Sequence, residues 1–520
     1  MTQLIHQFLA QNAQKIGDSD AVVCREQSMT YRELDIASNK LANRLLALNV
    51  ERGSRVGIYM DKSLNMAVSI YAALKAGCVY VPMDPNAPIQ RLCTIVNDCD
   101  VEILLSSDNK AKKIDKMLPR LKHSMIVIGS SDVSGCESYN WDWVHHTPTV
   151  VAPELPIKEQ DLAYIIYSSG STGKPKGITH SHQSCLSFAK WGADTINVQP
   201  TDRLGNHCPL HFDISTFDWF AAVIAGACVV LVPEEYIKMP ASYASLLKQA
   251  EVTVLYTVPF ALIQFSQVES FTDKDLPDLR QIIFAGEPMS TKHLRKLLDN
   301  LPSASFHNWY GPAETNVCTA FTVTALDKHA LSLPIGHPCG FAKVKIMSDQ
   351  EQEVSAGQTG ELWIHSPSTM ASYWARPELN NSVFVEREEQ GAYLRYYKTG
   401  DLVLQDDDGL IWFAGRKDRQ VKIRGYRVEL DEVEAALVSH DEVEEAAVFC
   451  LSDGSTQSST LLAVYTSRTQ KDMSHKELMK HIKSILPSYA LPASIVHVEQ
   501  LPRTSSGKID RRTLEEEIIG

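Results

Sequence analysis

Strand-like and helix-like segments alternate along most of this chain. Residues 56–60 are apolar like a buried strand, and residues 64–75 carry apolar side chains at helical spacing after a capping Ser63. Residues 79–82 return to a strand pattern. The same alternation recurs around residues 164–167, 229–232, 252–256 and 281–284. Because β-α-β units build largely parallel sheets covered by helices, this alternation predicts an α/β fold for most of the chain.

The last hundred residues follow a different pattern, which predicts a small α+β unit. Its expected elements are helices at 431–440 and 474–486 and strands at 446–451, 461–466 and 495–498. Ser474 and Glu477 form a predicted capping box at the second helix. The join at 415–426 is charged and punctuated by glycines, as a hinge would be. We therefore divide the 520 residues into domains 1–417 and 418–520.

Composition and charge exclude several classes of protein. The chain has 50 Lys and Arg against 63 Asp and Glu, and its formal net charge is -13. No basic field would attract nucleic acid or a membrane surface. Residues 1–17 lack the basic start and apolar core of a secretory signal. The longest apolar run, 219–232, contains Gly226 and stops at Pro233, so it is too short to span a bilayer and is predicted to be buried core.

The cysteines indicate a reducing compartment. The chain has 11 of them, they are scattered, and no Cys-x-x-Cys pair occurs. This usage speaks against disulfides and against a structural zinc site. Together with the missing secretory signal, it predicts a cytoplasmic protein.

A glycine- and hydroxyl-rich loop follows the strand at 164–167. Its sequence over residues 167–177 is Tyr-Ser-Ser-Gly-Ser-Thr-Gly-Lys-Pro-Lys-Gly. Glycines permit tight turns, while hydroxyl and N–H groups can cradle phosphate oxygens beside Lys174 and Lys176. The spacing is not that of a Walker A loop. From the loop alone, phosphate binding and an ordinary surface loop are equally good interpretations. The candidate phosphate-binding residues are Ser168, Ser169, Gly170, Ser171, Thr172, Gly173 and Lys174.

This loop resembles the phosphate loop of the adenylate-forming superfamily, which includes acyl-CoA ligases, luciferases and the adenylation domains of nonribosomal peptide synthetases. Further motifs resembling those of the superfamily follow in the right order over nearly the whole chain: 74–77, 80–85, 212–215, 308–315, 360–362, 397–402, 415–427 and 507–511. The resemblance implies a large α/β N-terminal domain, with parallel sheets and a β-barrel-like part, and a small mobile α+β C-terminal domain.

The resemblance also implies the reaction. Such enzymes join a carboxylate to ATP with release of pyrophosphate, then pass the acyl group from the adenylate to a thiol. The site must therefore neutralise charge at the α-phosphate and align the two reactants. Glu314 resembles the Mg²⁺ ligand, Tyr310 would stack on adenine, and Asp401 would accept the ribose hydroxyls. Thr172 and Lys508 complete the implied catalytic set with Glu314. The other implied ATP-binding residues are Gly286, Glu287, Pro288, Asn308, Trp309, Gly311, Ala313 and Arg416.

Two positions depart from or extend this pattern. Ala313 stands where many relatives carry threonine, so a hydroxyl contact to phosphate is lost. Lys508 resembles the lysine that bridges the substrate carboxylate and the ATP oxygens, a role that suits a compact charge on a flexible stem. The resemblance implies that the small domain delivers Lys508, then turns about Asp418 so that Gly425 lines the path of the thiol.

Asp213 indicates which kind of acid is activated. In amino-acid-activating relatives an aspartate at this place pairs with the substrate α-ammonium, whereas aryl- and fatty-acid ligases generally lack it. A buried carboxylate without a cation would be costly. The alternative is that Asp213 simply caps the helix that follows it.

The implied amino-acid pocket is small and apolar. Phe217, Tyr256 and Trp309 would fill much of it. The set resembles that of dedicated prolyl adenylating enzymes, with alanine, D-alanine and valine as rival substrates; the aromatic residues are alternatively ordinary core. The substrate-binding residues are predicted to be Phe212, Asp213, Ile214, Phe217, Tyr256, Ile283, Ala285, Trp309, Val317, Cys318 and Lys508.

The acceptor is inferred from what the chain lacks. Only nine residues follow Arg511, and the chain starts directly with the adenylating core, so neither a carrier nor a condensation domain is expected within it. We predict an amino acid ligase that loads the phosphopantetheine arm of a separate carrier protein in natural-product biosynthesis. A D-alanine–carrier protein ligase of cell-wall synthesis and an acyl- or aryl-CoA ligase remain the alternatives. A luciferase-like oxygenase fits an amino-acid pocket poorly.

Overall fold

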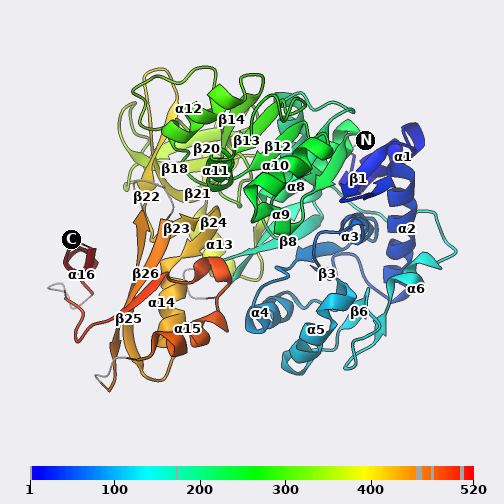
Figure 1. Cartoon of the computed structure of the whole chain (residues 1–520), viewed down its shortest axis with the longest axis horizontal. Coiled ribbons are helices and arrows are strands. Elements are labelled where there is room, and N and C mark those ends of the chain that lie inside the picture. The colour runs from blue at the N-terminus through cyan, green and yellow to red at the C-terminus, as the bar shows by residue number, and fades with distance from the viewer. Residues whose placement is uncertain (1–2, 171–173, 453–458, 470–472, 504–508, 520) are drawn as a thin grey trace. The chain divides into compact units, whose positions relative to one another are not determined.

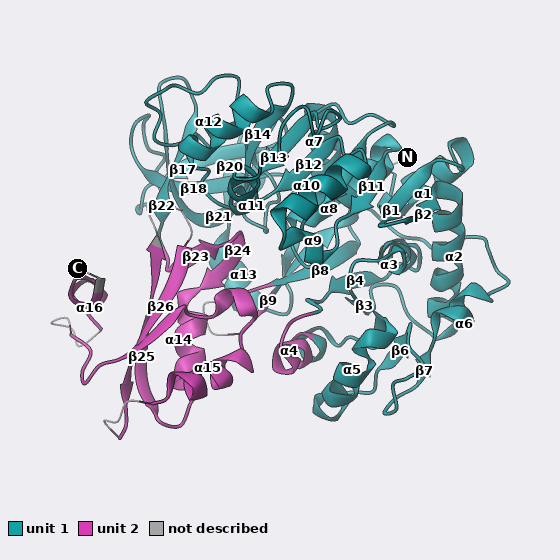
Figure 2. Cartoon of the chain, viewed as in Figure 1, with its two compact units in different colours: residues 1–85, 96–167, 177–417 teal, residues 86–95, 168–176, 418–520 magenta. Residues whose placement is uncertain are grey.

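The computed structural model describes residues 3–170, 174–452, 459–469, 473–503 and 509–519. The chain forms two compact units, coloured separately in Figure 2. The first unit comprises Met1–Pro85, Val96–Tyr167 and Gly177–Lys417, and the second comprises Asn86–Ile95, Ser168–Lys176 and Asp418–Gly520. The step from one unit to the other at Lys417 and Asp418 coincides with the predicted boundary. The two shorter segments of the second unit come from earlier in the chain, and the division into domains 1–417 and 418–520 stays a prediction.

The predicted α/β architecture is confirmed in the first unit, where an eight-stranded sheet has the order β19-β9-β8-β4-β3-β5-β6-β7. Helix α3 (Leu64–Lys75) has the predicted bounds, and the Ser63 hydroxyl accepts the Met66 N–H at 3.3 Å, as its capping role requires. The strands are β3 (Arg55–Tyr59), β4 (Val79–Pro82), β5 (Ile103–Ser106), β6 (Ile126–Ile128), β7 (Ser138–Tyr139), β8 (Leu162–Ser168), β9 (Lys176–Ser181) and β19 (Ser372–Tyr373).

A second sheet of the first unit has nine strands in the order β16-β15-β14-β13-β12-β10-β11-β1-β2, visible in green and blue in Figure 1. Its centre is parallel, from β1 through β14. The strands are β1 (Asp20–Cys24), β2 (Gln27–Thr30), β10 (Arg203–Asn206), β11 (Cys228–Leu231), β12 (Val254–Thr257), β13 (Gln281–Phe284), β14 (Ser305–Tyr310), β15 (Thr319–Thr322) and β16 (His337–Pro338).

Helices α7 (His182–Thr195) and α8 (Ile214–Ala225) pack against each other, and α8 packs on β10, β11 and β12. The apolar run at 219–232 forms the end of α8 and strand β11, and Gly226 ends the helix with φ +79°. The run is buried core, as predicted. The other helices of the first unit are α1 (Ile5–Lys15), α2 (Tyr31–Ala47), α5 (Ala111–Met117), α6 (Trp141–His145), α9 (Glu234–Ile237), α10 (Pro240–Gln249), α11 (Pro259–Phe265), α12 (Thr291–Asn300) and α13 (Pro377–Val383). Helix α4 (Ile89–Cys99) belongs mostly to the second unit, because the division falls after Ile95.

The first unit also contains a five-stranded antiparallel sheet. Buried Leu362, Ile364 and Val403 join Cys318 and Ile335 in one apolar cluster, which ties this sheet to the loop after β14. The strands are β17 (Lys343–Met347), β18 (Gly360–His365), β20 (Phe384–Glu389), β21 (Ala392–Gln405) and β22 (Ile411–Arg416).

The second unit is the predicted small α+β structure. Buried Val433, Leu437 and Val448 belong to its core. It contains β23 (Gln420–Ile423), β24 (Tyr426–Glu429), α14 (Leu430–Val438), β25 (Val443–Ser452), β26 (Ser459–Ser467), α15 (His475–Lys483), β27 (Ser494–His497) and α16 (Arg511–Ile519). The predicted capping box of α15 is wrong: the Ser474 side chain makes no cap hydrogen bond, and the helix ends at Lys483 rather than at residue 486. Ser474 has φ -59° and ψ 121°, non-helical angles that an N-cap residue can adopt with or without a side-chain hydrogen bond.

Two polar contacts explain why earlier segments group with the second unit. The Arg91 guanidinium and the Glu432 carboxylate form an ion pair at 2.9 Å, and their side chains are only 6% and 7% exposed. The Ser169 hydroxyl donates to the Arg427 carbonyl oxygen at 2.9 Å. Burial raises the pKa of Glu432, and the opposing charge of Arg91 counteracts this shift.

Neither a membrane span nor a protein metal cluster is found in the part of the chain that the structure describes. None of its helices is long and apolar enough to cross a bilayer. Its His, Cys, Asp and Glu side chains form no group of three that could hold a metal ion. All 11 cysteines lie in this part, and none of them forms a disulfide there.

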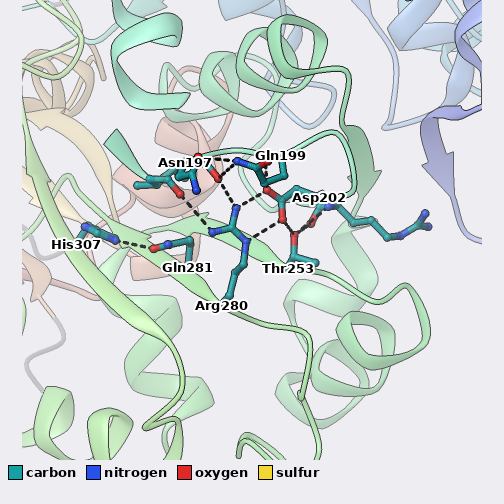
Figure 3. A network of polar contacts seen from close by, with 9 residues as sticks. Asn197, Gln199, Asp202, Thr253, Arg280, Gln281 and His307 are labelled. Atoms are coloured by element: carbon teal, nitrogen blue, oxygen red, sulfur yellow. Dashed lines mark hydrogen bonds and ion pairs between the residues drawn. The ribbon is translucent and has the colours of Figure 1, made fainter. Parts of the chain in front are cut away.

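A polar network joins the amino-terminal ends of the parallel strands in the nine-stranded sheet (Figure 3). Asp202 precedes β10, Thr253 precedes β12 and Arg280 precedes β13. The Thr253 hydroxyl donates to Asp202 Oδ1 at 2.7 Å, and Arg280 Nε donates to the same oxygen at 2.9 Å. Arg280 also donates to the Asn197 carbonyl at 2.7 Å, while His307 on β14 contacts Gln281 Oε1 at 2.7 Å.

We expect Asp202→Asn to destabilise the first unit. Burial alone would raise the pKa of Asp202, but hydrogen bonds from Arg280, the Gln199 N–H and Thr253 outweigh it and lower the pKa. The charged form therefore contributes stability above the unfolded-state pKa, and this contribution is lost as pH falls through the folded-state pKa. Urea unfolding at pH 7 is expected to show a loss of about 1.5–3 kcal/mol, the range for hydrogen bonds to charged groups.

The effect is expected to shrink below about pH 4, where the carboxyl group of the unfolded chain is protonated. Asp132→Asn, at an exposed position, is the control and is expected to leave the unfolding midpoint unchanged. An equal loss of stability at pH 7 and pH 3 would contradict the assigned role of the Asp202 charge.

Candidate active site

The carboxyl ends of three parallel strands bring the predicted site residues together. Tyr256 lies near the end of β12, Ala285 directly follows β13, and Tyr310 ends β14. Tyr256 pairs in register with Ile283, and the next strand continues the same parallel register. Because the carboxyl ends of parallel strands meet at one edge of the sheet, this edge is where ligands bind in α/β folds.

Asp213 lies at the start of α8 but does not cap it. The residue has helical dihedral angles, φ -57° and ψ -35°, and its side chain makes no cap hydrogen bond. The Thr216 and Ser215 hydroxyls instead donate to the carbonyls of Asp213 and Phe212, at 2.7 and 2.8 Å. Burial raises the pKa of Tyr256 well above its usual value, and the Asp213 charge adds to this shift. The Asp213 side chain does not cap the helix, so that alternative is wrong, and its charge contributes to the raised pKa of Tyr256 on β12.

Three aromatic side chains of the predicted pocket pack edge to face. Ring centroids lie 5.6 Å apart for Phe217 and Tyr256, 5.2 Å for Phe217 and Trp309, and 5.3 Å for Tyr256 and Trp309. All three are buried and belong to the main apolar core of the first unit. Of the other predicted substrate-binding residues, Phe212 is half-buried, and the fully buried ones are Ile214, Ile283, Ala285, Val317 and Cys318. Lys508 lies outside the described residues.

Asp401 forms a buried polar group with Tyr310 and Arg416. The Tyr310 hydroxyl donates to Asp401 Oδ2, and Arg416 forms an ion pair with Oδ1. Asp401 and Arg416 are neighbours because β21 and β22 pair them directly. Burial and then the Asp401 charge raise the pKa of Tyr310 well above its usual value, so its hydroxyl stays protonated. A carboxylate has about four acceptor positions, so one such group can accept hydrogen bonds from several donors at once.

Glu314 is fully buried and is held by a residue that sequence reasoning missed. The Tyr373 hydroxyl on β19 donates to Glu314 Oε1 at 2.5 Å, and it lies 3.1 Å from the Tyr397 hydroxyl. Residues 314 and 373 are far apart in sequence, so no local sequence pattern predicts this contact. One carboxylate is too few for a cation held by protein alone, but it suits Mg²⁺ that takes its other ligands from phosphate oxygens and water.

His180 on β9 fixes the backbone at Ala313. Its Nε2 lies 2.9 Å from the Ala313 carbonyl oxygen, and its Nδ1 lies 3.2 Å from the Ser184 hydroxyl. Burial lowers the pKa of His180 to about 4, so the ring is neutral at pH 7. Position 313 thus lacks a hydroxyl but has a fixed backbone.

The remaining residues near β13 and β14 have mainly backbone roles. Asn308 Nδ2 donates to the Pro334 carbonyl at 2.8 Å, which commits its side chain to the loop. Position 311 requires glycine, because a Cβ there would lie 1.6 Å from the Asn316 carbonyl oxygen. Gly286 has φ +93°, which glycine tolerates best, and it starts the half-exposed segment with Glu287 and Pro288.

The glycine-rich loop belongs to the second unit. A Cβ at Gly170 would lie 2.2 Å from the Lys174 carbonyl oxygen, so the backbone atoms of these two residues lie close together. Lys174 is exposed, Ser168 ends β8, and Ser169 makes the Arg427 contact given above. Ser171, Thr172 and Gly173 lie outside the described residues, so their predicted roles are not described.

The predicted hinge and thiol-path residues also lie in the second unit. The Asp418 carboxylate accepts the Gln420 N–H at 3.2 Å, at the start of the last segment of this unit. Gly425 has φ +83° in the tight turn between β23 and β24. Both geometries suit a chain reversal, and the roles of Asp418 and Gly425 stay predictions.

Comparisons with known proteins identify relatives along the whole chain. Residues 9–374 match the AMP-binding enzyme family, and residues 432–508 match the AMP-binding enzyme C-terminal domain. The chain is 34% identical over 519 residues to an L-proline–[L-prolyl-carrier protein] ligase of Pseudomonas fluorescens, covering 100% of each. A ligase of the same name from Streptomyces coelicolor is 36% identical over 496 residues, 94% of this chain and 91% of that protein.

Among solved structures, the chain resembles the Vibrio cholerae adenylation domain AlmE in complex with glycyl-adenosine-5′-phosphate. The TM-score is 0.86 at 23% identity, covering 100% of this chain and 98% of that chain. This likeness establishes the fold.

We expect Tyr373→Phe to destabilise the first unit, because it removes a buried donor from the Glu314 carboxylate. Urea unfolding is expected to show a loss of about 1.5–3 kcal/mol. Tyr139→Phe is the matched control, since the Tyr139 hydroxyl also donates to a glutamate, Glu137, but at the surface. That variant is expected to change stability by less than about 0.5 kcal/mol. Equal effects of the two substitutions would contradict the role of the buried hydrogen bond.

Proposed function

The chain belongs to the AMP-binding enzyme family, and we propose that it is an ATP-dependent ligase for a small apolar amino acid, L-proline. In this proposal the amino acid is activated as aminoacyl-AMP with release of pyrophosphate. The aminoacyl group is then transferred to the phosphopantetheine thiol of a carrier protein in natural-product biosynthesis. The prolyl ligases of P. fluorescens and S. coelicolor, similar over nearly their full length, support this substrate and this acceptor.

The position of Asp213 is the observation that carries the proposal. Its side chain does not cap α8. Its negative charge contributes to the raised pKa of Tyr256, which lies at the carboxyl edge of the sheet. A carboxylate held there offers a counter-charge for the α-ammonium or secondary ammonium of an amino acid. An acyl- or aryl-CoA ligase has no use for such a charge. Apolar neighbours supply no partner for a charged substrate side chain, so a compact apolar one fits best.

We assign the nucleotide to the group formed by Tyr310, Asp401 and Arg416. The adenine would lie on the Tyr310 ring, with Gly286, Glu287 and Pro288 opposite, while Asp401 accepts ribose hydroxyls. Arg416 would reach ribose or phosphate oxygens while it holds the Asp401 carboxylate in place. Mg²⁺ bound at Glu314 would neutralise phosphate charge, and Tyr373 orients that carboxylate through its hydroxyl.

The catalytic assignments outside the described residues follow from the motifs alone. Thr172 would donate to phosphate oxygens. Lys508 would bridge the amino-acid carboxylate and the ATP oxygens, which reduces their mutual repulsion and aligns the attack. We assign the delivery of Lys508 to the domain 418–520, with Asp418 as hinge and Gly425 on the path of the thiol.

The first test is amino-acid-dependent ATP–pyrophosphate exchange with all proteinogenic amino acids, D-alanine, benzoate and a fatty acid. We expect L-proline to give the highest exchange. A maximum with D-alanine would support a D-alanine–carrier protein ligase instead. Exchange only with acids that lack an amine would contradict the role of Asp213 and support a CoA ligase.

Asp213→Asn tests the ammonium contact directly, because it removes the charge and keeps the shape. The Michaelis constant for L-proline is expected to rise about 10- to 150-fold, the range for a lost charged hydrogen bond, with the constant for ATP unchanged. Asp194→Asn, at an exposed position of α7, is the control with no expected effect. An unchanged constant for proline in Asp213→Asn would exclude this contact.

Lys508→Ala is expected to abolish adenylate formation while leaving the thermal unfolding midpoint close to that of the wild type. The reason is that a lost cation leaves the two negatively charged reactants uncompensated. Proline-dependent pyrophosphate exchange measures the first effect, and calorimetry measures the second. Near-normal exchange in the variant would refute the role of Lys508.

A further inference from the structure

Helix α7 forms the wall behind the aromatic side chains of the predicted pocket. Phe188 and Gly192 lie one turn apart, with Trp191 beside them. The Phe188 ring lies 5.8 Å from the Phe217 ring and 6.3 Å from the Trp309 ring, and Trp191 lies 5.0 Å from Trp309. No predicted substrate-binding residue comes from α7, so this wall is a feature of the structure that the sequence motifs do not contain.

Two aromatic rings lie very close to the backbone of α7 at Gly192. A Cβ at this position would lie 2.5 Å from Cε2 of Phe217 and 3.0 Å from Cη2 of Trp309. The first distance is far below van der Waals contact, so even alanine would displace the Phe217 ring. Glycine destabilises a helix interior relative to alanine, and these rings give a physical reason for its presence here.

A side chain at position 192 would push the Phe217 ring toward the proposed amino-acid site. Phe217 follows Asp213 by four residues at the start of α8, so the two side chains lie on the same face. On its other sides the ring contacts Tyr256 and Trp309. A ring pushed away from α7 therefore moves toward the side on which Asp213 would hold the substrate ammonium.

We propose that Gly192 is a specificity-determining positioning residue, because the missing side chain lets Phe217 rest against α7 and leaves room for a substrate side chain of the size of proline. This inference rests on the proposed amino-acid site. A larger residue at position 192 narrows that site in favour of glycine and alanine. Gly192 acts through Phe217 and contacts no substrate itself.

The test compares the exchange kinetics of the wild type, Gly192→Ala and the double variant Gly192→Ala with Phe217→Leu, using L-proline, L-alanine and glycine. In Gly192→Ala, the ratio of kcat/KM for proline to that for glycine is expected to fall about 10- to 200-fold, the range for one misplaced methylene group. The loss is expected in the Michaelis constant for proline, with that for ATP unchanged. Because leucine removes the ring atoms that the Cβ meets, the double variant is expected to recover most of the ratio.

The matched control is Gly340→Ala, since a Cβ at Gly340 meets no atom within 4 Å, and it is expected to leave the ratio unchanged. An equal loss for proline and glycine in Gly192→Ala, or no recovery in the double variant, would overturn the proposal. If the wild type prefers another amino acid, the proposed substrate is wrong. The ratio of kcat/KM for larger amino acids to that for smaller ones still tests the role of Gly192.

Crystal structures of the wild type and Gly192→Ala give a readout that does not depend on turnover, even if no amino acid supports exchange. We expect the Phe217 ring to move away from α7 with the helix in place. An unmoved ring beside a shifted α7 would overturn the proposal. If Gly192→Ala alone does not fold, the same comparison is made between the double variant and Phe217→Leu, where equal proline-to-glycine ratios would support the role of the ring.

Discussion

The parallel register of β12, β13 and β14 is the constraint on which the candidate site depends. It places Tyr256, Ala285 and Tyr310 at one edge of the sheet, although they come from three separate turns of the chain. At the opposite ends of the strands, an ion pair between buried Asp202 and half-buried Arg280 connects β10 and β13. The two edges of the sheet thus differ: internal ion pairs and hydrogen bonds stabilise the amino-terminal edge, while the candidate ligand site lies at the carboxyl edge.

The aromatic side chains of the candidate site are tightly packed. Edge-to-face packing of Phe217, Tyr256 and Trp309 leaves little freedom for any one ring, because each is stopped by the other two. Close-packed interiors transmit displacement over short distances. In the proposed site, the shape available to a substrate would therefore depend partly on α7, whose residues pack behind the three rings.

Sequence periodicity predicted the alternating α/β architecture, the bounds of α3 with its Ser63 cap, and the small α+β unit. Motif resemblance brought Asp213, Glu314, Tyr310 and Asp401 to attention. The capping box at Ser474 failed because a residue pattern permits a cap without compelling the side chain to form it. The contacts of Tyr373 with Glu314 and of His180 with Ala313 join residues more than fifty positions apart, and local patterns carry no information on such pairs.

The hydrogen bond from Tyr310 and the ion pair with Arg416 have a consequence for ligand binding at Asp401. Tyr310 and Arg416 already fix the orientation of this carboxylate in the folded chain. A side chain that must first be ordered loses rotamer entropy when its ligand arrives, and that loss weakens affinity. Here the ordering is completed during folding. If Asp401 binds ribose hydroxyls as proposed, its carboxylate is already in its final orientation when they arrive. The entropic cost of ordering the side chain then lowers the stability of the protein rather than the affinity for the ligand.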